Sequence, residues 1–293
     1  MLTPSGIIPA MVTPLDDRDR VNLAVLRDLV EHLIRGGVHG LFALGSQGEF
    51  WAFDEAEKRL VIETVVEAVG GRVPVYAGTG AVTTREAVQL TAVAEGAGAD
   101  AVSVITPFYI TPSDEELYEH YAAIARATRL PVLLYANPAR TSCPLRPPLV
   151  ARLAKIENIV GIKDSSGDLS LTAEYIRVGG EGFSVLAGRD TLILATLLYG
   201  GRGAIAATAN VAPALVVSIY ERFRCGDLEG ALEAQRRLSP LRHAFELGTF
   251  PAVIKEALGL MGMRAGPCRA PVRRLDPEKR AQLEGVLREL GLV

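Results

Sequence analysis

Four stretches of the sequence decide the fold that it predicts: VPVYAG (residues 73–78), AVSVIT (101–106), PVLLYA (131–136) and FSVLAG (183–188). Each is a continuous, mainly apolar run rather than an alternation of polar and apolar residues. Such runs are typical of parallel strands that helices cover on both faces. Similar runs elsewhere bring the predicted strands to eight, with starts 20 to 33 residues apart, at residues 7–12, 40–45, 73–78, 101–106, 132–135, 159–163, 183–187 and 203–207.

Helix signals fill the segments between these strands. Asn22 is placed to cap a helix over residues 23–35, and Pro213 stands near the start of another. Capping-box pairs open three more predicted helices: Asp54 with Glu57, Thr83 with Glu86, and Ser113 with Glu116. Eight strand–helix units of this length favour an α/β protein of the (β/α)8 or TIM-barrel class. An open doubly wound sheet is the less favoured alternative, because regular units leave no switch point and no glycine fingerprint follows the first strand.

The chain continues for about 85 residues after the eighth strand, with helical patterns only. Beyond the helix that starts near Pro213, these patterns predict helices at residues 227–247, 252–260 and 277–290. We therefore expect a barrel over residues 1–225 that carries the active site. Residues 226–293 are expected to form a helical C-terminal extension.

Composition excludes several classes of protein. The 293 residues are 49% hydrophobic and 22% charged, with a net charge of -3, so nothing points to a nucleic-acid or membrane partner. No apolar run is long enough to span a bilayer, and the N-terminus lacks the features of a signal peptide. The three cysteines are scattered, which favours a reducing compartment. We expect a cytoplasmic enzyme.

A barrel of this class carries its chemistry where the strands end. Lys163 is distinctive there, because it follows the apolar run Ile159–Ile162 while the other four lysines lie in helical segments where a solvated face is expected. A lysine buried without a paired charge loses its proton more easily and can then attack a carbonyl to give a Schiff base. The pattern fits equally well a lysine that pairs with Asp164, and these two interpretations stay open.

Other strand ends offer groups that could act with such a lysine. Tyr135 could move protons, although a core tyrosine bonded to backbone fits as well. Arg140 suits a carboxylate but could be a surface arginine, and Ser46 lies in a glycine-rich turn. None of the four histidines ends a strand or has ligand spacing, so we expect no metal. No Walker pattern or complete dinucleotide fingerprint occurs, so we expect no cofactor.

Six segments together match a known family: GSQGEF (45–50), AGTGA (77–81), TPFY (106–109), LLYANPART (133–141), GIKDSSGD (161–168) and ATANVAP (207–213). Over nearly its whole length the chain resembles the dihydrodipicolinate synthase / N-acetylneuraminate lyase family of pyruvate-dependent class I aldolases. The resemblance implies that Lys163 forms the Schiff base, that Tyr135 is the proton shuttle and that Ser46 continues the proton relay. Tyr109 matches a tyrosine that reaches a neighbouring subunit's site, and the resemblance also implies a homotetramer built as a dimer of dimers.

The resemblance also implies a set of substrate-binding residues. Backbone N–H groups of Gly45, Ser46 and Gln47 would hold the pyruvyl carboxylate. Ile205 matches a residue that lines the pyruvyl pocket, Arg140 matches the arginine that binds the second substrate's carboxylate, and Gly188 at the end of the seventh strand is expected to line the same site. No metal or organic cofactor is implied.

Departures from the family pattern bear on the substrate. The synthases usually have two threonines where this chain has Ser46 and Gln47, and GSQGEF looks more like the 2-oxo-acid aldolases. We therefore expect cleavage of a 4-hydroxy-2-oxo acid, such as hydroxy-oxoglutarate or a keto-deoxy sugar acid. The alternatives are 4-hydroxy-tetrahydrodipicolinate synthase, which condenses pyruvate with aspartate semialdehyde, a keto-deoxy sugar acid dehydratase, and a catalytically silent binding barrel.

Overall fold

The computed structural model describes residues 2–293 and contains eight parallel strands. They are hydrogen-bonded in the order β1-β8-β7-β6-β5-β4-β3-β2, and a bridge between Ala10 and Phe42 joins the two ends of this sheet. The predicted barrel is confirmed. The strands are β1 (Gly6–Pro9), β2 (Leu41–Ala43), β3 (Val75–Gly78), β4 (Ala101–Ile105), β5 (Val132–Ala136), β6 (Ile159–Asp164), β7 (Ser184–Ala187) and β8 (Gly203–Ala206).

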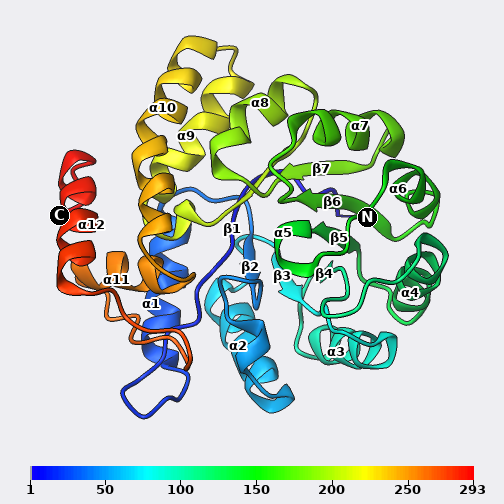
Figure 1. The fold of residues 1–293 in the computed structure, drawn as a ribbon, viewed down its shortest axis with the longest axis horizontal. Helices are drawn as coiled ribbons and strands as arrows, with labels where there is room; N and C mark the ends of the chain where they lie inside the picture. Colours follow the sequence, from blue (N-terminus) through cyan, green and yellow to red (C-terminus); the bar gives the residue numbers. More distant parts are fainter. Residues whose placement is uncertain (1) are drawn as a thin grey trace.

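Helices surround these central strands (Figure 1). The longer ones that follow the strands are α1 (Leu23–Arg35), α2 (Glu55–Val69), α3 (Thr84–Gly96), α4 (Asp114–Arg126), α6 (Pro147–Leu153), α7 (Leu169–Gly179), α8 (Ile193–Leu198) and α9 (Pro213–Arg224), with a single short turn α5 (Pro138–Thr141) after β5. The predicted caps are present: the side chain of Asn22 accepts from the N–H of Val25, and Asp54 and Ser113 each form a full capping box. Thr83 caps α3 through its own side chain.

Buried apolar side chains form two layers. The inner layer fills the barrel itself with one or two side chains from most strands, including Ile8, Phe42, Tyr76, Leu133, Leu186 and Ile205. The outer layer lies between the strands and the helices and is much larger. The inner layer fills the barrel up to the carboxyl ends of the strands, so the polar groups at these ends lie directly above apolar side chains.

The C-terminal extension consists of three helices. α10 (Leu228–Ala244) packs along α9, and α11 (Ala252–Leu260) and α12 (Pro277–Glu289) follow it at one side of the barrel (Figure 1). The expected helix over 227–247 ends earlier than predicted, because the chain tightens into a 3-10 turn at Phe245–Leu247. The division of the chain at residue 225 stays a prediction. Within residues 2–293, no helix combines the length and apolar character needed to cross a membrane.

The second strand is shorter than its apolar run predicts. β2 stops at Ala43 because Leu44 adopts a φ of +56°, a left-handed conformation that turns the chain out of the sheet. The residues from Gly45 onward therefore form a loop over the barrel rim. The first strand likewise ends at Pro9, before the expected limit at Val12.

Candidate active site

Lys163 and Tyr135 lie side by side on neighbouring strands. They are register partners in the parallel pair β5–β6, so both side chains point to the inside of the barrel. The amine of Lys163 lies 4.0 Å from the centre of the Tyr135 ring and 5.1 Å from that of Phe42. Both residues are buried. The register thus brings a lysine amine and a tyrosine ring together above the apolar side chains that fill the barrel.

Asp164 does not pair with Lys163. Successive residues of a strand face opposite sides of the sheet, and Asp164 therefore points outward to α7. Its carboxylate accepts a 2.6 Å hydrogen bond from the hydroxyl of Thr172 and a 2.9 Å bond from the N–H of Ser166. Within residues 2–293 no carboxylate forms an ion pair with the Lys163 amine. The alternative left open by the sequence is therefore excluded.

The hydroxyl of Tyr135 is the centre of a polar network. It lies 3.3 Å from the hydroxyl of Ser46 and accepts a 3.0 Å hydrogen bond from the amide of Asn137. Burial by itself raises the pKa of Tyr135. The charge of Lys163 and hydrogen bonds from Ser46, Asn137 and Ser165 outweigh it, so the pKa of Tyr135 lies below its usual value. Such a hydroxyl can give up and take back a proton more readily than a free tyrosine.

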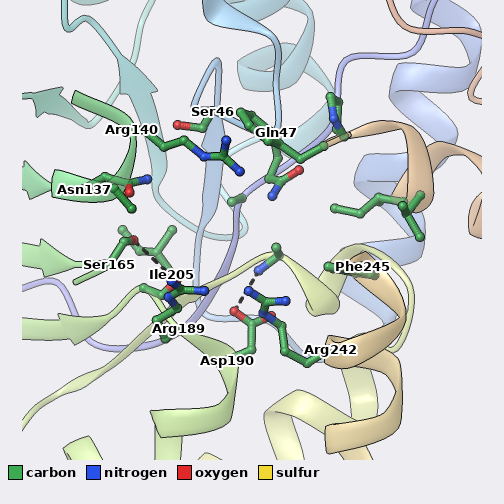
Figure 2. A pocket seen from close by; sticks show the side chains of 18 of the residues that line it. Ser46, Gln47, Asn137, Arg140, Ser165, Arg189, Asp190, Ile205, Arg242 and Phe245 are labelled. Carbon is green, nitrogen blue, oxygen red and sulfur yellow. Dashed lines mark hydrogen bonds between the residues drawn. The ribbon is translucent and has the colours of Figure 1, made fainter. Parts of the chain in front are cut away.

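A cavity of about 560 Å³ opens above these groups, between the barrel rim and the C-terminal extension (Figure 2). Seven of the nine residues expected at the site line it: Ser46, Gln47, Tyr135, Arg140, Lys163, Gly188 and Ile205. Gly45 is not among the lining residues. Tyr109 is 98% exposed on the outside of the chain, so the structure does not bring it into this protomer's cavity.

Gly188 is required by the close packing of the rim. A side chain there would collide with the hydroxyl of Ser165 and with the backbone of Asp164. The Ser165 hydroxyl donates to the carbonyl of Gly188 at 3.4 Å. The glycine thus lets the ends of β6 and β7 approach each other beside the Lys163 amine.

Comparison with known proteins identifies the family to which this chain belongs. A model of the dihydrodipicolinate synthetase family matches residues 3–290. The 4-hydroxy-tetrahydrodipicolinate synthase of Methanopyrus kandleri is 42% identical over 290 residues, which cover 98% of this chain and 97% of that one. The chain belongs to the dihydrodipicolinate synthetase family. It is accordingly a pyruvate-dependent lyase of the class I aldolase type, as the resemblance implied.

Solved structures of the family agree closely with this fold. A crystal structure of dihydrodipicolinate synthase has a TM-score of 0.95 at 38% identity, covering 99% of this chain and 100% of its own. A prophage protein of the family from E. coli, in complex with pyruvate, has a TM-score of 0.95 at 36% identity and covers 99% of both chains. The names of the relatives favour the synthase reaction, which the sequence analysis gave as an alternative, over the aldolase reaction that it preferred.

Several polar residues that line the cavity were given no role by sequence reasoning, among them Asn137, Ser165, Arg189 and Arg242. Asn137 and Ser165 each lie directly after a strand, so their position at the rim was the signal that could have identified them. Arg189 also follows a strand, at the end of β7. Arg242 lies in the last turn of α10, and its approach to the cavity depends on how that helix folds back.

One lysine is placed differently from the expectation. Lys255 was expected on a solvated helix face, but it is buried and its amine lies 2.5 Å from the carboxylate of Glu49. It also donates to the carbonyl of Pro267 at 2.8 Å, while the other Glu49 oxygen accepts from the N–H of Arg269 at 2.9 Å. The extension is thereby fastened to the GSQGEF loop that carries Ser46 and Gln47.

Proposed function

We propose that this lyase makes or breaks a carbon–carbon bond next to a pyruvyl group held as a Schiff base on Lys163. One observation carries the proposal. The Lys163 amine has no ion-pair partner within residues 2–293 and lies 4.0 Å from the ring of Tyr135, whose hydroxyl contacts Ser46 and Asn137. An amine, a proton-transfer group and an open cavity are the parts that this chemistry needs.

The reaction begins when the amine attacks the C2 carbonyl of a 2-oxo acid. A carbon–nitrogen bond forms, and the carbonyl oxygen leaves as water after it has received protons. Tyr135 is placed to deliver and recover these protons, with Ser46 next in the relay. Loss of a proton from C3, or cleavage of the C3–C4 bond, gives the enamine. In the cleavage direction, protonation of the enamine at C3 and hydrolysis of the Schiff base release pyruvate. In the condensation direction, C3 of the enamine forms a carbon–carbon bond to the aldehyde carbon, the aldehyde oxygen takes up a proton, and hydrolysis releases the condensed product. Both directions restore the amine.

Two reactions are supported by different observations. The names of the relatives support aspartate semialdehyde, and thus the 4-hydroxy-tetrahydrodipicolinate synthase reaction. Arg140 in the cavity wall suits the carboxylate of that substrate. The second candidate is the cleavage of a 4-hydroxy-2-oxo acid. It is favoured by Gln47, which lines the cavity where the resemblance leads one to expect a smaller threonine.

The homotetramer and the cytoplasmic location remain proposals. Support for the tetramer comes from Tyr109, a large side chain that is 98% exposed beside the half-exposed Ile110. A partner chain that covers these two residues would remove apolar surface from water. Sedimentation of the purified protein measures the state directly.

Borohydride reduction in the presence of pyruvate, followed by peptide mass spectrometry, tests the central proposal. We expect a reduced pyruvyl adduct on Lys163 and on no other lysine. Lys163→Ala should lose both the adduct and turnover, whereas Lys279→Ala, a change at an exposed lysine on α12, is the matched control. Turnover by a folded Lys163→Ala variant would refute the Schiff-base mechanism.

A further inference from the structure

Three arginines line the cavity, and two of them lie away from the loop that carries Ser46. Figure 2 places Arg140 near Ser46 and Gln47, and places Arg189 and Arg242 near Asp190. Arg189 follows β7, and Arg242 reaches the cavity from the last turn of α10. The family resemblance gave a role to Arg140 only. The other two guanidinium groups therefore need an explanation of their own.

Neither Arg189 nor Arg242 has an acidic partner within residues 2–293. Asp190 is buried close to them, but its carboxylate is used elsewhere: it accepts from the N–H of Thr208 at 2.6 Å and from the Thr208 hydroxyl at 2.5 Å. Glu246 at the rim is exposed and forms no ion pair in the described chain. Both guanidinium groups thus face the cavity without a neutralising contact.

The cavity is basic in a chain that is acidic as a whole. Four basic residues line it (Lys163, Arg140, Arg189 and Arg242) against two acidic ones, whereas the net charge of the chain is -3. Like charges gathered at one wall repel each other, and an anion placed between them relieves that repulsion. A guanidinium also binds carboxylates through paired hydrogen bonds.

Arg140 and Arg189 contact different parts of the chain. Arg140 lies over the ring of Phe250, 4.3 Å from its centre. Arg189 packs on Gly167, where an added Cβ would lie only 3.3 Å from its Nε. Gly167 has a φ of +81°, a conformation that glycine adopts without strain. The loop after β6 therefore packs against the side chain of Arg189, which also lines the cavity.

We propose that Arg189 and Arg242 form a second anion subsite, which takes the distal carboxylate of a 2-oxo diacid whose keto group reacts with Lys163. This inference rests on the proposed Schiff-base function and selects between the two reactions proposed for it. Aspartate semialdehyde is a zwitterion: a guanidinium pair attracts its carboxylate but repels the ammonium group on the same carbon, so the net attraction is weak. A 4-hydroxy-2-oxo diacid adds negative charge where the cavity is positive, so it is the better match.

Three 2-oxo acids serve as probes in borohydride trapping. Pyruvate is the reference. 2-Oxoglutarate has a distal carboxylate but lacks the 4-hydroxyl needed for cleavage, and 2-oxopentanoate has the same chain length without that carboxylate. The measured quantity is the concentration of each acid that gives half-maximal adduct on Lys163. We expect 2-oxoglutarate to reach it at roughly ten- to hundredfold lower concentration than 2-oxopentanoate, the effect of one charge-assisted contact.

Arg189→Met and Arg242→Met should each remove most of this advantage, relative to pyruvate measured in the same variant. Arg236→Met, a change at an exposed residue of the same helix, should leave it intact. Equal half-maximal concentrations for the two longer acids would overturn the subsite, and so would an advantage lost only in Arg140→Met. Absence of any pyruvate adduct would instead refute the Schiff-base function. In that case the subsite is tested by whether 2-oxoglutarate raises the melting temperature more than 2-oxopentanoate does.

Discussion

Replacement of Lys255 by methionine tests how strongly the buried Glu49–Lys255 pair fastens the extension to the site loop. Methionine keeps most of the length and apolar contact of the lysine but removes its charge. The side chains of Lys255 and Glu49 are 2% and 0% exposed, so water cannot replace the lost partner. Glu49 would keep only the N–H of Arg269 as a hydrogen-bond donor. Removal of one partner from a buried pair generally costs ~3–5 kcal/mol.

The carboxylate of Glu49 limits this loss of stability, because it can take up a proton when Lys255 is absent. Protonation of an ordinary glutamic acid at pH 7 costs roughly 3.7 kcal/mol, so we expect Lys255→Met to lower the free energy of unfolding by about 3–4 kcal/mol. The melting temperature should fall by roughly 6–15 °C. The folded variant then binds a proton that the unfolded chain does not. The difference in free energy of unfolding between Lys255→Met and the unsubstituted protein should therefore shrink as the pH falls toward about 4.3.

Thermal and denaturant unfolding followed by circular dichroism, at pH 7 and pH 5, measures both effects. Lys279→Met is the matched control, because Lys279 is 50% exposed and its pair with Asp276 spans 3.6 Å. An exposed pair of this kind contributes about 0–1 kcal/mol. A double variant, Glu49→Gln with Lys255→Met, should recover part of the stability. Equal losses in Lys255→Met and Lys279→Met, or a deficit that does not change with pH, would refute this reasoning.

Three further predictions concern titrating groups. Tyr135→Phe should lower turnover by roughly 10²–10⁴-fold as a lost proton shuttle. Ser46→Ala should raise the pKa of Tyr135, because the hydrogen bond from Ser46 lowers it. The titration is followed by tyrosinate absorption, and Tyr135→Phe identifies the part of the signal that belongs to Tyr135. An unchanged titration would contradict the contact between Ser46 and Tyr135. Burial lowers the pKa of His120 to about 4, so its contribution to stability is complete above about pH 6.5 and is lost as the pH falls toward 4. Between pH 7 and pH 4.5, His120→Phe should reduce that acid sensitivity by roughly 2 kcal/mol, and unfolding curves at the two pH values measure it.

Local patterns were enough to predict the barrel. Mainly apolar runs mark the strands, since a strand that helices cover on both faces buries nearly all of its side chains. The caps at Asn22, Asp54 and Ser113 were predicted correctly because a cap depends on residues within one helical turn. Strand ends were less accurate: Leu44 leaves β2 in a left-handed conformation that its apolar character does not announce.

The site was predicted in part, and for a related reason. Lys163 stood out from the sequence because it follows an apolar strand, whereas the other four lysines lie in helical segments. Whether it paired with Asp164 or faced Tyr135 was open, because that choice depends on strand register and on the alternation of side chains across the sheet. Neither property is visible in one segment alone.

The sequence by itself determined the fold class and the family, and it singled out Lys163 as the candidate Schiff-base lysine, because each depends on short motifs within single segments. Only the tertiary structure decided which groups meet. Lys255 pairs with Glu49, and Arg189 and Arg242 line the same cavity, because α10 and α11 fold back over the barrel rim. Charges far apart in sequence acquire partners, or remain without them, only when folding brings their segments together, and the exclusion of water makes a buried pair such as Glu49–Lys255 costly to break.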